Sequence, residues 1–121
     1  MEWEFRNGIP IYQQIVLAMQ IRIANGTYPP GSKVPAVREL ALEAGVNPNT
    51  MQRALAELER EELLAAMRTS GRYVTQDQER LRRLRGELST AFIKELFENL
   101  RHLGMSDDEI TEAVRKWREH T

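Results

Sequence analysis

The sequence predicts a mainly α-helical protein with a small β-hairpin, arranged as a winged helix-turn-helix followed by two C-terminal helices. Three observations carry this prediction. Residues 35–55 hold two short helical segments that are separated by only a few residues. Residues 63–75 form two extended runs around a polar turn. Residues 77–121 are rich in charged helix formers, with leucines recurring every three or four positions.

Length and composition restrict the class of protein. A chain of 121 residues suits one compact domain with a small appendage. The formal charge is −1, from 17 Lys and Arg against 18 Asp and Glu, so any binding to nucleic acid depends on where charges are placed. No cysteine is present, and no apolar run approaches the roughly 20 residues of a membrane span. We expect a soluble cytoplasmic protein that has no disulfide and no membrane partner.

The first 34 residues are expected to support the two helices after them. Residues 2–9 are predicted to form a short extended arm with large side chains at Trp3 and Phe5. A first amphipathic helix then begins at Pro10, which suits the first position of a helix. Residues 28–31 read Tyr-Pro-Pro-Gly. Because each proline restricts the backbone, this segment is predicted to be a rigid loop that sets the angle to the next helix.

Two short helices come next, with a tight connection. The first is predicted to run from about Pro35 to Ala44, after which Gly45 supplies a left-handed residue. Asn47 followed by Pro48 provides an N-cap and a rigid first position for the next helix. One helix therefore ends and another begins within three residues, which is the layout of a helix-turn-helix DNA reader.

The second of these helices has a polar face that suits a DNA major groove. Met51, Leu55 and Leu58 fall on one side, and polar residues fall on the other. Asparagine and glutamine can pair with adenine, arginine can bind guanine or a phosphate, and threonine can touch a phosphate or a thymine methyl. An ordinary solvated face is the alternative. The candidate base-reading residues are Asn49, Thr50, Gln52 and Arg53.

Further cations surround this face. Arg38 lies near the start of the preceding helix, where it is expected to reach the same DNA surface; its alternative is a pair within the helix with an acid such as Glu43. A hairpin after a helix-turn-helix is a wing, and the loop and wing offer Lys33, Arg68 and Arg72 for phosphate or minor-groove contact. Their alternative is a set of isolated surface charges. The arginines of the following segment are expected instead to form a solvated helix face, with contact to the DNA backbone as the alternative: Arg80, Arg82, Arg83 and Arg85.

The C-terminal segment is predicted to hold two helices. The first is long and amphipathic and ends at Gly104, with Gly86 marking either a bend or its start. Ser106 and Glu109 form the capping-box signature of the last helix. The apolar stripe either packs on its own domain or meets the same stripe of a second subunit, and we favour the homodimer. The expected dimerisation residues are Leu88, Phe92, Leu96, Leu100 and Trp117.

The sequence offers no constellation for catalysis. His102 and His120 lack ligand-like spacing, so no metal site is expected. No phosphate-binding glycine loop and no nucleophile elbow are present. We therefore expect neither an enzyme nor a cofactor.

Taken together, several runs resemble the GntR family of winged-helix transcriptional regulators. These runs are residues 10–15 (PIYQQI), 30–35 (PGSKVP), 37–41 (VRELA) and 46–55 (VNPNTMQRAL). The Asn-Pro-Asn-Thr run and the short helical tail resemble the YtrA subfamily in particular.

This resemblance implies a winged helix-turn-helix over residues 1–76 that binds a palindromic operator in double-stranded DNA as a homodimer, and a dimerisation tail over residues 77–121. It assigns DNA contacts to Arg38 and to the start of the third helix, and it makes Gly71 the wing-tip glycine. It further implies a repressor, for which the sequence marks no effector pocket. A winged-helix module that binds protein without reading DNA is the alternative.

Three positions depart from the family pattern. Ala36 stands where a serine is common, so a hydroxyl at the start of the second helix is missing. Glu62 replaces the usual glycine after the third helix, where a left-handed residue is needed. The wing turn of residues 68–71 carries one glycine in place of two.

Overall fold

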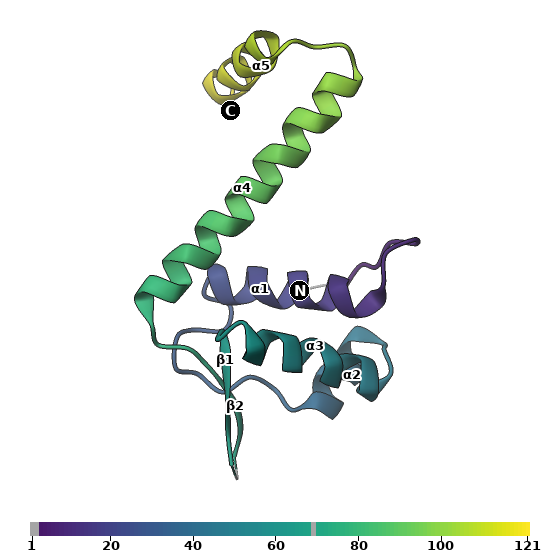
Figure 1. Ribbon diagram of the computed structural model, residues 1–121, viewed down its shortest axis with the longest axis vertical. Coiled ribbons are helices and arrows are strands. Elements are labelled where there is room, and N and C mark those ends of the chain that lie inside the picture. The colour runs from purple at the N-terminus through teal and green to yellow at the C-terminus, as the bar shows by residue number, and fades with distance from the viewer. Residues whose placement is uncertain (1–2, 69) are drawn as a thin grey trace. The chain divides into compact units, whose positions relative to one another are not determined.

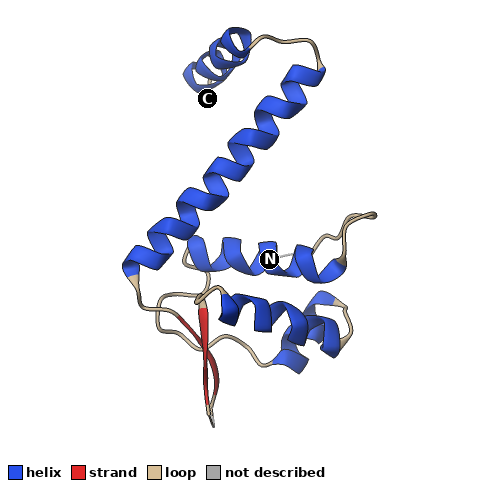
Figure 2. Cartoon of the chain, in the orientation of Figure 1, coloured by secondary structure: helices blue, strands red, loops and turns tan. Residues whose placement is uncertain are grey.

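The computed structural model describes residues 3–68 and 70–121, which divide into two compact units, residues 1–85 and 86–121. The chain is mostly helical with one antiparallel hairpin, so the predicted fold class is confirmed (Figures 1 and 2). In chain order the elements are α1 (Ile11–Ala24), α2 (Val37–Ala44), α3 (Pro48–Arg60), β1 (Leu64–Met67), β2 (Gly71–Val74), α4 (Gln78–His102) and α5 (Asp107–Glu119).

The core of the first unit forms where α1 and α2 both pack against α3. The apolar side chains that the three helices bury between them supply most of the driving force that holds the helices together. The start of α4 adds Leu81 and Leu84 to the buried set. The largest fully buried side chains of this unit are Ile15, Met19, Leu40, Met51, Leu55, Leu58, Leu63 and Leu84.

The turn between α2 and α3 has the predicted local chemistry. Gly45 is left-handed, with φ at 71°, and its N–H and that of Val46 close the end of α2. Asn47 is the N-cap of α3, and its side chain accepts a hydrogen bond from the backbone N–H of Asn49 at 2.7 Å. The start of α2 is two residues later than expected: its N-cap is Ala36, which makes no side-chain hydrogen bond to the helix.

The end of α3 repeats this closure without a glycine. The N–H of Glu62 donates to the carbonyl of Glu59 at 2.9 Å, and the N–H of Leu63 donates to that of Leu58 at 3.0 Å. This is a Schellman motif, which needs a left-handed residue. Glu62 takes that conformation with φ at 63°, although it has a Cβ. A positive φ is unfavourable for such a residue.

The wing is a hairpin that projects away from the three helices (Figure 1). Leu64 pairs with Val74 at its base and Met67 with Gly71 at its far end, so β2 begins one residue earlier than expected. Residues 31–34 run along the other side of β2: the N–H of Val34 donates to the carbonyl of Arg72 at 3.0 Å. The segment that begins at the last residue of the predicted loop, Gly31, is thus a short strand-like partner of the wing. Thr69, in the predicted turn, lies outside the described residues.

The N-terminal arm packs on α1 through its aromatic side chains. The rings of Trp3 and Phe5 lie 6.2 Å apart, and the guanidinium of Arg22 lies 4.1 Å from the centre of the Trp3 ring. Arg22 also donates to the hydroxyl of Tyr28 at 3.0 Å. The arm and the loop together cover this arginine, which is 3% exposed. Glu2, where the predicted arm begins, lies outside the described residues.

The start of α4 is tied to the end of α3. Asp77 accepts hydrogen bonds from the backbone N–H groups of Glu79 and Arg80. The prediction that Arg80 belongs to a solvated face is wrong. Arg80 is 6% exposed, because its Nε donates at 2.8 Å to the carbonyl of Glu61, at the C-terminal end of α3.

The second unit consists of the rest of α4 and α5. The helix runs through Gly86 without starting or ending there. Ser106 and Glu109 form the predicted capping box at the start of α5. Arg101 binds both carboxylate oxygens of Asp107, at 2.8 and 2.9 Å, and joins the end of α4 to the start of α5. Among the described residues, no helix is long and apolar enough to cross a membrane.

Candidate nucleic-acid interface

The exposed face of α3 carries the predicted base-reading residues. Asn49, Gln52 and Arg53 are exposed, and Thr50 is half-buried. On the opposite side Met51, Ala54, Leu55 and Leu58 are completely buried, which fixes the rotation of the helix about its axis. The face therefore presents two amides and a guanidinium to solvent within two turns.

One edge of this face is joined to the wing. Glu59 forms an ion pair with Arg72 of β2, whose side chain is only 17% exposed. The guanidinium of Arg72 is thus engaged within the chain. This ion pair fixes the wing against α3.

Lys33 and Gly71 meet on the wing itself. A Cβ at Gly71, whose φ is 105°, would lie 3.0 Å from Cε of Lys33. The glycine therefore lets the lysine side chain pass close to the hairpin. Residues 33–37 and 70–72 together line a cavity of about 370 Å³. The structure thus brings Lys33, Gly71 and Arg72 together, and all three lie beside the start of α2.

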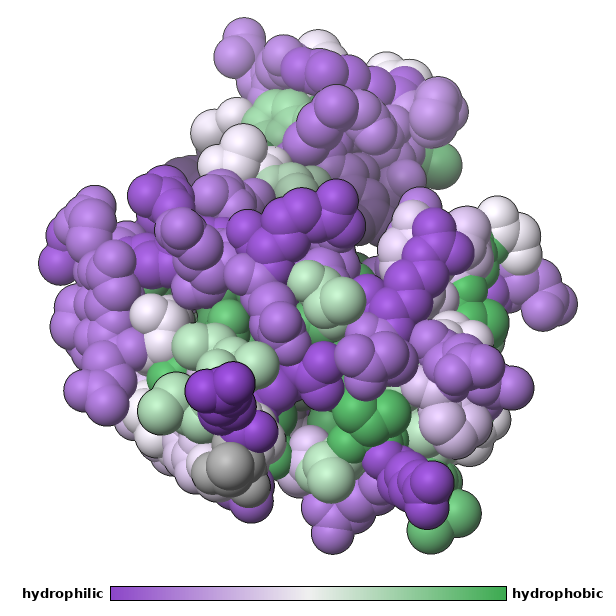
Figure 3. Space-filling model, turned by 60° about the horizontal axis from the view of Figure 1, so that its bottom comes forward, coloured by the Kyte–Doolittle hydropathy of each residue, from purple (hydrophilic) through white to green (hydrophobic). Residues whose placement is uncertain are grey.

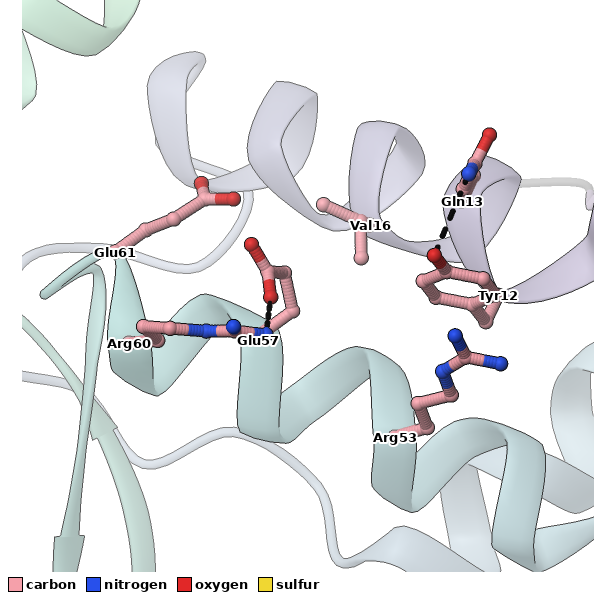
Figure 4. A pocket seen from close by; sticks show the side chains of 7 residues that line it. All are labelled: Tyr12, Gln13, Val16, Arg53, Glu57, Arg60 and Glu61. Atoms are coloured by element: carbon pink, nitrogen blue, oxygen red, sulfur yellow. Dashed lines mark hydrogen bonds and ion pairs between the residues drawn. The ribbon is translucent and has the colours of Figure 1, made fainter.

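The other edge of the α3 face meets α1. The guanidinium of Arg53 lies 3.6 Å from the centre of the Tyr12 ring, at one end of a notch of about 520 Å³ (Figure 4). Gln13 donates to the Tyr12 hydroxyl at 3.3 Å. At the other end of the notch, Glu57 pairs with Arg60. Sequence reasoning did not single out Tyr12, since nothing in the spacing of residues 10–15 shows which helix this ring faces.

The remaining predicted cations lie apart from these contacts. Arg38 is exposed near the start of α2, and Arg68 is exposed after the end of β1. In the part of the chain that the structure describes, Arg38 forms no ion pair with Glu43. Its guanidinium is therefore available to an external anion.

Acidic groups limit the positive potential of this region. Burial raises the pKa of the Glu61 carboxyl, an effect that the hydrogen bond from Gln20 opposes and the neighbouring Glu57 reinforces. Seen from the hairpin end, the surface is mostly hydrophilic, with small apolar areas between the charged side chains (Figure 3). The arrangement favours a polar, hydrogen-bonding contact over a purely cationic one.

The second unit carries a separate set of exposed apolar side chains. Of the predicted dimerisation residues, Phe92 is 45% exposed, Leu96 40% and Trp117 69%. Leu88 and Leu100 are half-buried. Three further apolar residues of this unit, outside the predicted dimerisation set, are also exposed: Ile93, Leu103 and Val114.

The two histidines lie at helix ends. Within residues 3–68 and 70–121, no group of three or more His, Cys, Asp or Glu side chains is placed to hold a metal ion. His102 lies at the end of α4, and His120 follows the end of α5.

Comparison with known proteins identifies the family. Residues 11–74 match the model of the bacterial regulatory proteins of the gntR family. An uncharacterized HTH-type transcriptional regulator of Bacillus subtilis, YhcF, is 30% identical over 119 residues, which cover 98% of each chain. The HTH-type transcriptional repressor YtrA of the same organism is 42% identical over 72 residues, which cover 60% of this chain and 55% of the repressor.

Solved structures agree with these matches. A GntR family transcriptional regulator from Listeria monocytogenes superimposes with a TM-score of 0.84 at 38% identity, over 93% of this chain and 98% of that one. AraR(DBD), solved in complex with operator ORX1, superimposes with a TM-score of 0.57 at 26% identity, over 62% of this chain and 99% of that domain. The chain therefore belongs to the gntR family and is a transcriptional regulator with a winged helix-turn-helix DNA-binding domain.

Proposed function

We propose that this regulator is a repressor that acts in the cytoplasm and binds a palindromic operator in double-stranded DNA as a homodimer. The observation that carries the proposal is the exposed polar face of α3, held by a buried core and bordered by a wing. The similarity to AraR(DBD), whose structure contains an operator, supports DNA as the partner here. Similarity to the repressor YtrA supports repression as the mode of control.

The proposed contacts divide by position. Asn49 and Gln52 lie on the exposed face of α3 and are assigned to base edges, with Thr50 at its border. Arg38 is assigned to a phosphate or a guanine, since no acid of the described chain binds it. On the wing, Lys33, Arg68 and Gly71 are assigned to the DNA backbone and minor groove, and Arg72 supports them through Glu59.

Residues 1–76 are proposed to read DNA and residues 77–121 to form the dimer. The dimer surface would use Leu88, Phe92, Leu96, Leu100 and Trp117. Large apolar side chains left in solvent on one short segment are typical of an interface between subunits. A two-fold dimer places two α3 helices at half-sites about one turn of DNA apart.

Selection of bound sequences from a pool of random duplex DNA tests this proposal. We expect enrichment of an inverted repeat whose half-sites have a constant spacing. Enrichment of a single unrepeated site would contradict the homodimer, while leaving DNA reading in place. No enrichment at low salt would overturn the proposal and favour a winged-helix module that binds protein.

A further inference from the structure

Tyr12 of α1 determines where the charge of Arg53 lies. The centre of the Tyr12 ring is 3.6 Å from Cζ of Arg53, and Figure 4 shows the two side chains facing each other between α1 and α3. A guanidinium is attracted to the negative face of an aromatic ring, and arginine stacks in this way more readily than lysine. The contact thus selects one direction for the Arg53 side chain. Without it, this long and flexible side chain would sample many conformations.

The backbone of α3 by itself does not select this direction. Advancing about 100° per residue from buried Met51, Asn49 falls at about 160° and Arg53 at about 200°, so both start near the centre of the exposed face. Gln52 falls at about 100°, on the edge that faces the wing. From its position Arg53 could reach across the centre or toward either edge, and the Tyr12 ring holds it on the α1 edge.

This edge has a definite role when a helix lies in the major groove. The centre of the inserted face is opposite the base edges, and the edges of the face approach the phosphate backbones. Glu57, one turn after Arg53, is occupied by Arg60. Within residues 3–68 and 70–121, Arg53 itself has no carboxylate partner, so its charge is available to a phosphate.

We propose that Tyr12 is a positioning residue that directs Arg53 to a phosphate and away from the base edges. The proposal rests on the proposed function, since it requires α3 to lie in the major groove. Tyr12 acts through its ring, which contacts Arg53, while its hydroxyl oxygen accepts a hydrogen bond from Gln13. Arg53 therefore contributes equal affinity on every DNA sequence, and the choice of sequence depends on neighbouring residues such as Asn49.

The test measures equilibrium binding of the full chain to its selected operator and to an unrelated duplex, each at several salt concentrations. Arg53→Ala is expected to weaken both complexes by the same factor and to lower the exponent of the salt dependence by about one. Tyr12→Leu is expected to weaken both about two- to fivefold, the range that a cation–π contact at an exposed site supports. Tyr12→Phe, which keeps the ring, is expected to bind as the wild type does.

A double variant separates positioning from folding. In the Arg53→Ala background, Tyr12→Leu is expected to have no further effect, because there is no guanidinium left to direct. Lys116→Ala removes one positive charge from α5 and serves as the charge-matched control. The thermal midpoint of each variant shows that folded protein is compared.

Each other result overturns the inference. If Arg53→Ala weakens operator binding alone, Arg53 reads a base. If Tyr12→Phe loses as much as Tyr12→Leu, the hydroxyl is the functional group. If Tyr12→Leu costs the same factor with and without Arg53, the tyrosine serves the fold. A wild type that selects no DNA sequence at all is a different result, and it defeats the proposed function.

Discussion

Asn49 is the residue whose proposed role is most clearly separable from the fold. Its backbone N–H is bound by Asn47, while its side chain is exposed near the centre of the α3 face. Replacing it with alanine removes the amide that could pair with an adenine, and alanine is a better helix former. Binding and stability should therefore change in different directions.

We predict that Asn49→Ala weakens operator binding by about 1–3 kcal/mol and relaxes the preference at one base pair of each half-site. Binding to unrelated DNA should stay as it is. Fluorescence anisotropy with operators substituted at single positions measures both effects. Gln78→Ala, which removes an exposed amide at the start of α4, is the matched control. An equal loss on all sequences would place Asn49 at a phosphate.

Glu62 bears a backbone strain that its neighbours impose. The Schellman closure of α3 and the burial of Leu63 require a left-handed residue at position 62. For a residue with a Cβ this conformation costs about 1–2 kcal/mol. A glycine at this position would avoid that cost, but part of the gain would be offset by the greater conformational freedom of glycine in the unfolded state.

Glu62→Gly is therefore expected to raise the free energy of unfolding by about 0.5–1 kcal/mol. Urea unfolding at one fixed protein concentration measures it. Glu95→Gly, which places a glycine in the middle of α4, should lower stability by about 1 kcal/mol instead. Equal effects of the two changes would show that φ at position 62 carries no strain.

At the scale of elements, the wing is held from two sides. Residues 31–34 bind β2 along one edge, and β1 binds it along the other. Arg72 adds the ion pair to α3. The hairpin is short, and two strands alone are marginally stable in water. These outer contacts are what give the wing a fixed direction.

Two glycines, one in the wing and one in α4, differ in whether the backbone conformation at their position requires a glycine. Gly71 has a φ of 105°, so Gly71→Ala should destabilise the fold by about 1 kcal/mol or more, chiefly through backbone strain. Gly86 lies inside α4, and a methyl group added to it would meet open space, so Gly86→Ala should stabilise by about 0.5–1 kcal/mol. Thermal unfolding of both variants checks the opposite signs. Stabilisation by Gly71→Ala would contradict the backbone geometry of the wing.

The last helix should be sensitive to acid. Hydrogen bonds from Ser106 lower the pKa of Glu109, and Arg101 lowers that of Asp107. A lowered pKa means that the folded chain binds protons less readily than the unfolded chain, so the stabilisation is present above the ordinary values of 4.5 and 3.8 and is lost as the pH falls below them.

Amide hydrogen exchange at a series of pH values measures this loss. We expect protection of α5 to fall below about pH 4.5 before that of α1 does. Glu109→Gln, which cannot titrate, should make the protection of α5 depend less on pH. If α5 and α1 lose protection together, global unfolding precedes any local effect of these carboxyls.

For the whole molecule, the proposed dimer depends on exposed side chains that are not part of the buried core of one chain. Phe92 and Trp117 are 45% and 69% exposed, so changing them should leave each chain folded. Aromatic residues of this kind carry much of the affinity of protein interfaces.

The double variant Phe92→Lys with Trp117→Ser is predicted to raise the dimer dissociation constant about a thousandfold, because two losses of about 2 kcal/mol each at a central contact add to about 4 kcal/mol. Sedimentation velocity measures it, and circular dichroism confirms that the helices persist. Arg118→Ala, beside Trp117, is the control. A variant that stays dimeric at the same concentrations would place the interface elsewhere.

Helix boundaries could be predicted because their causes are local. Gly45, Asn47 with Pro48, and the pair Ser106 and Glu109 each act within four residues of their position. The apolar spacing of α3 predicted which side is buried for the same reason, since a helix repeats every 3.6 residues. The candidate reading residues follow directly from that face.

What the sequence could not show depends on contacts between distant segments. Arg80 looks like its neighbours Arg82 and Arg83, and only the position of the Glu61 carbonyl makes it a buried residue. The stack of Tyr12 on Arg53 joins two helices whose relative placement no local pattern contains. Spacing along one helix gives the face on which a side chain begins, and not the group that the side chain meets.

The pairing of residues 31–34 with β2 has a consequence for the order of folding. The turn between α2 and α3 closes over a few residues, whereas Val34 must find Arg72 about 40 positions away. Closing so long a loop costs entropy that is recovered only once the intervening helices have packed. The wing is therefore expected to be the last part of the first unit to reach its native pairing, and the first to open when the chain is destabilised.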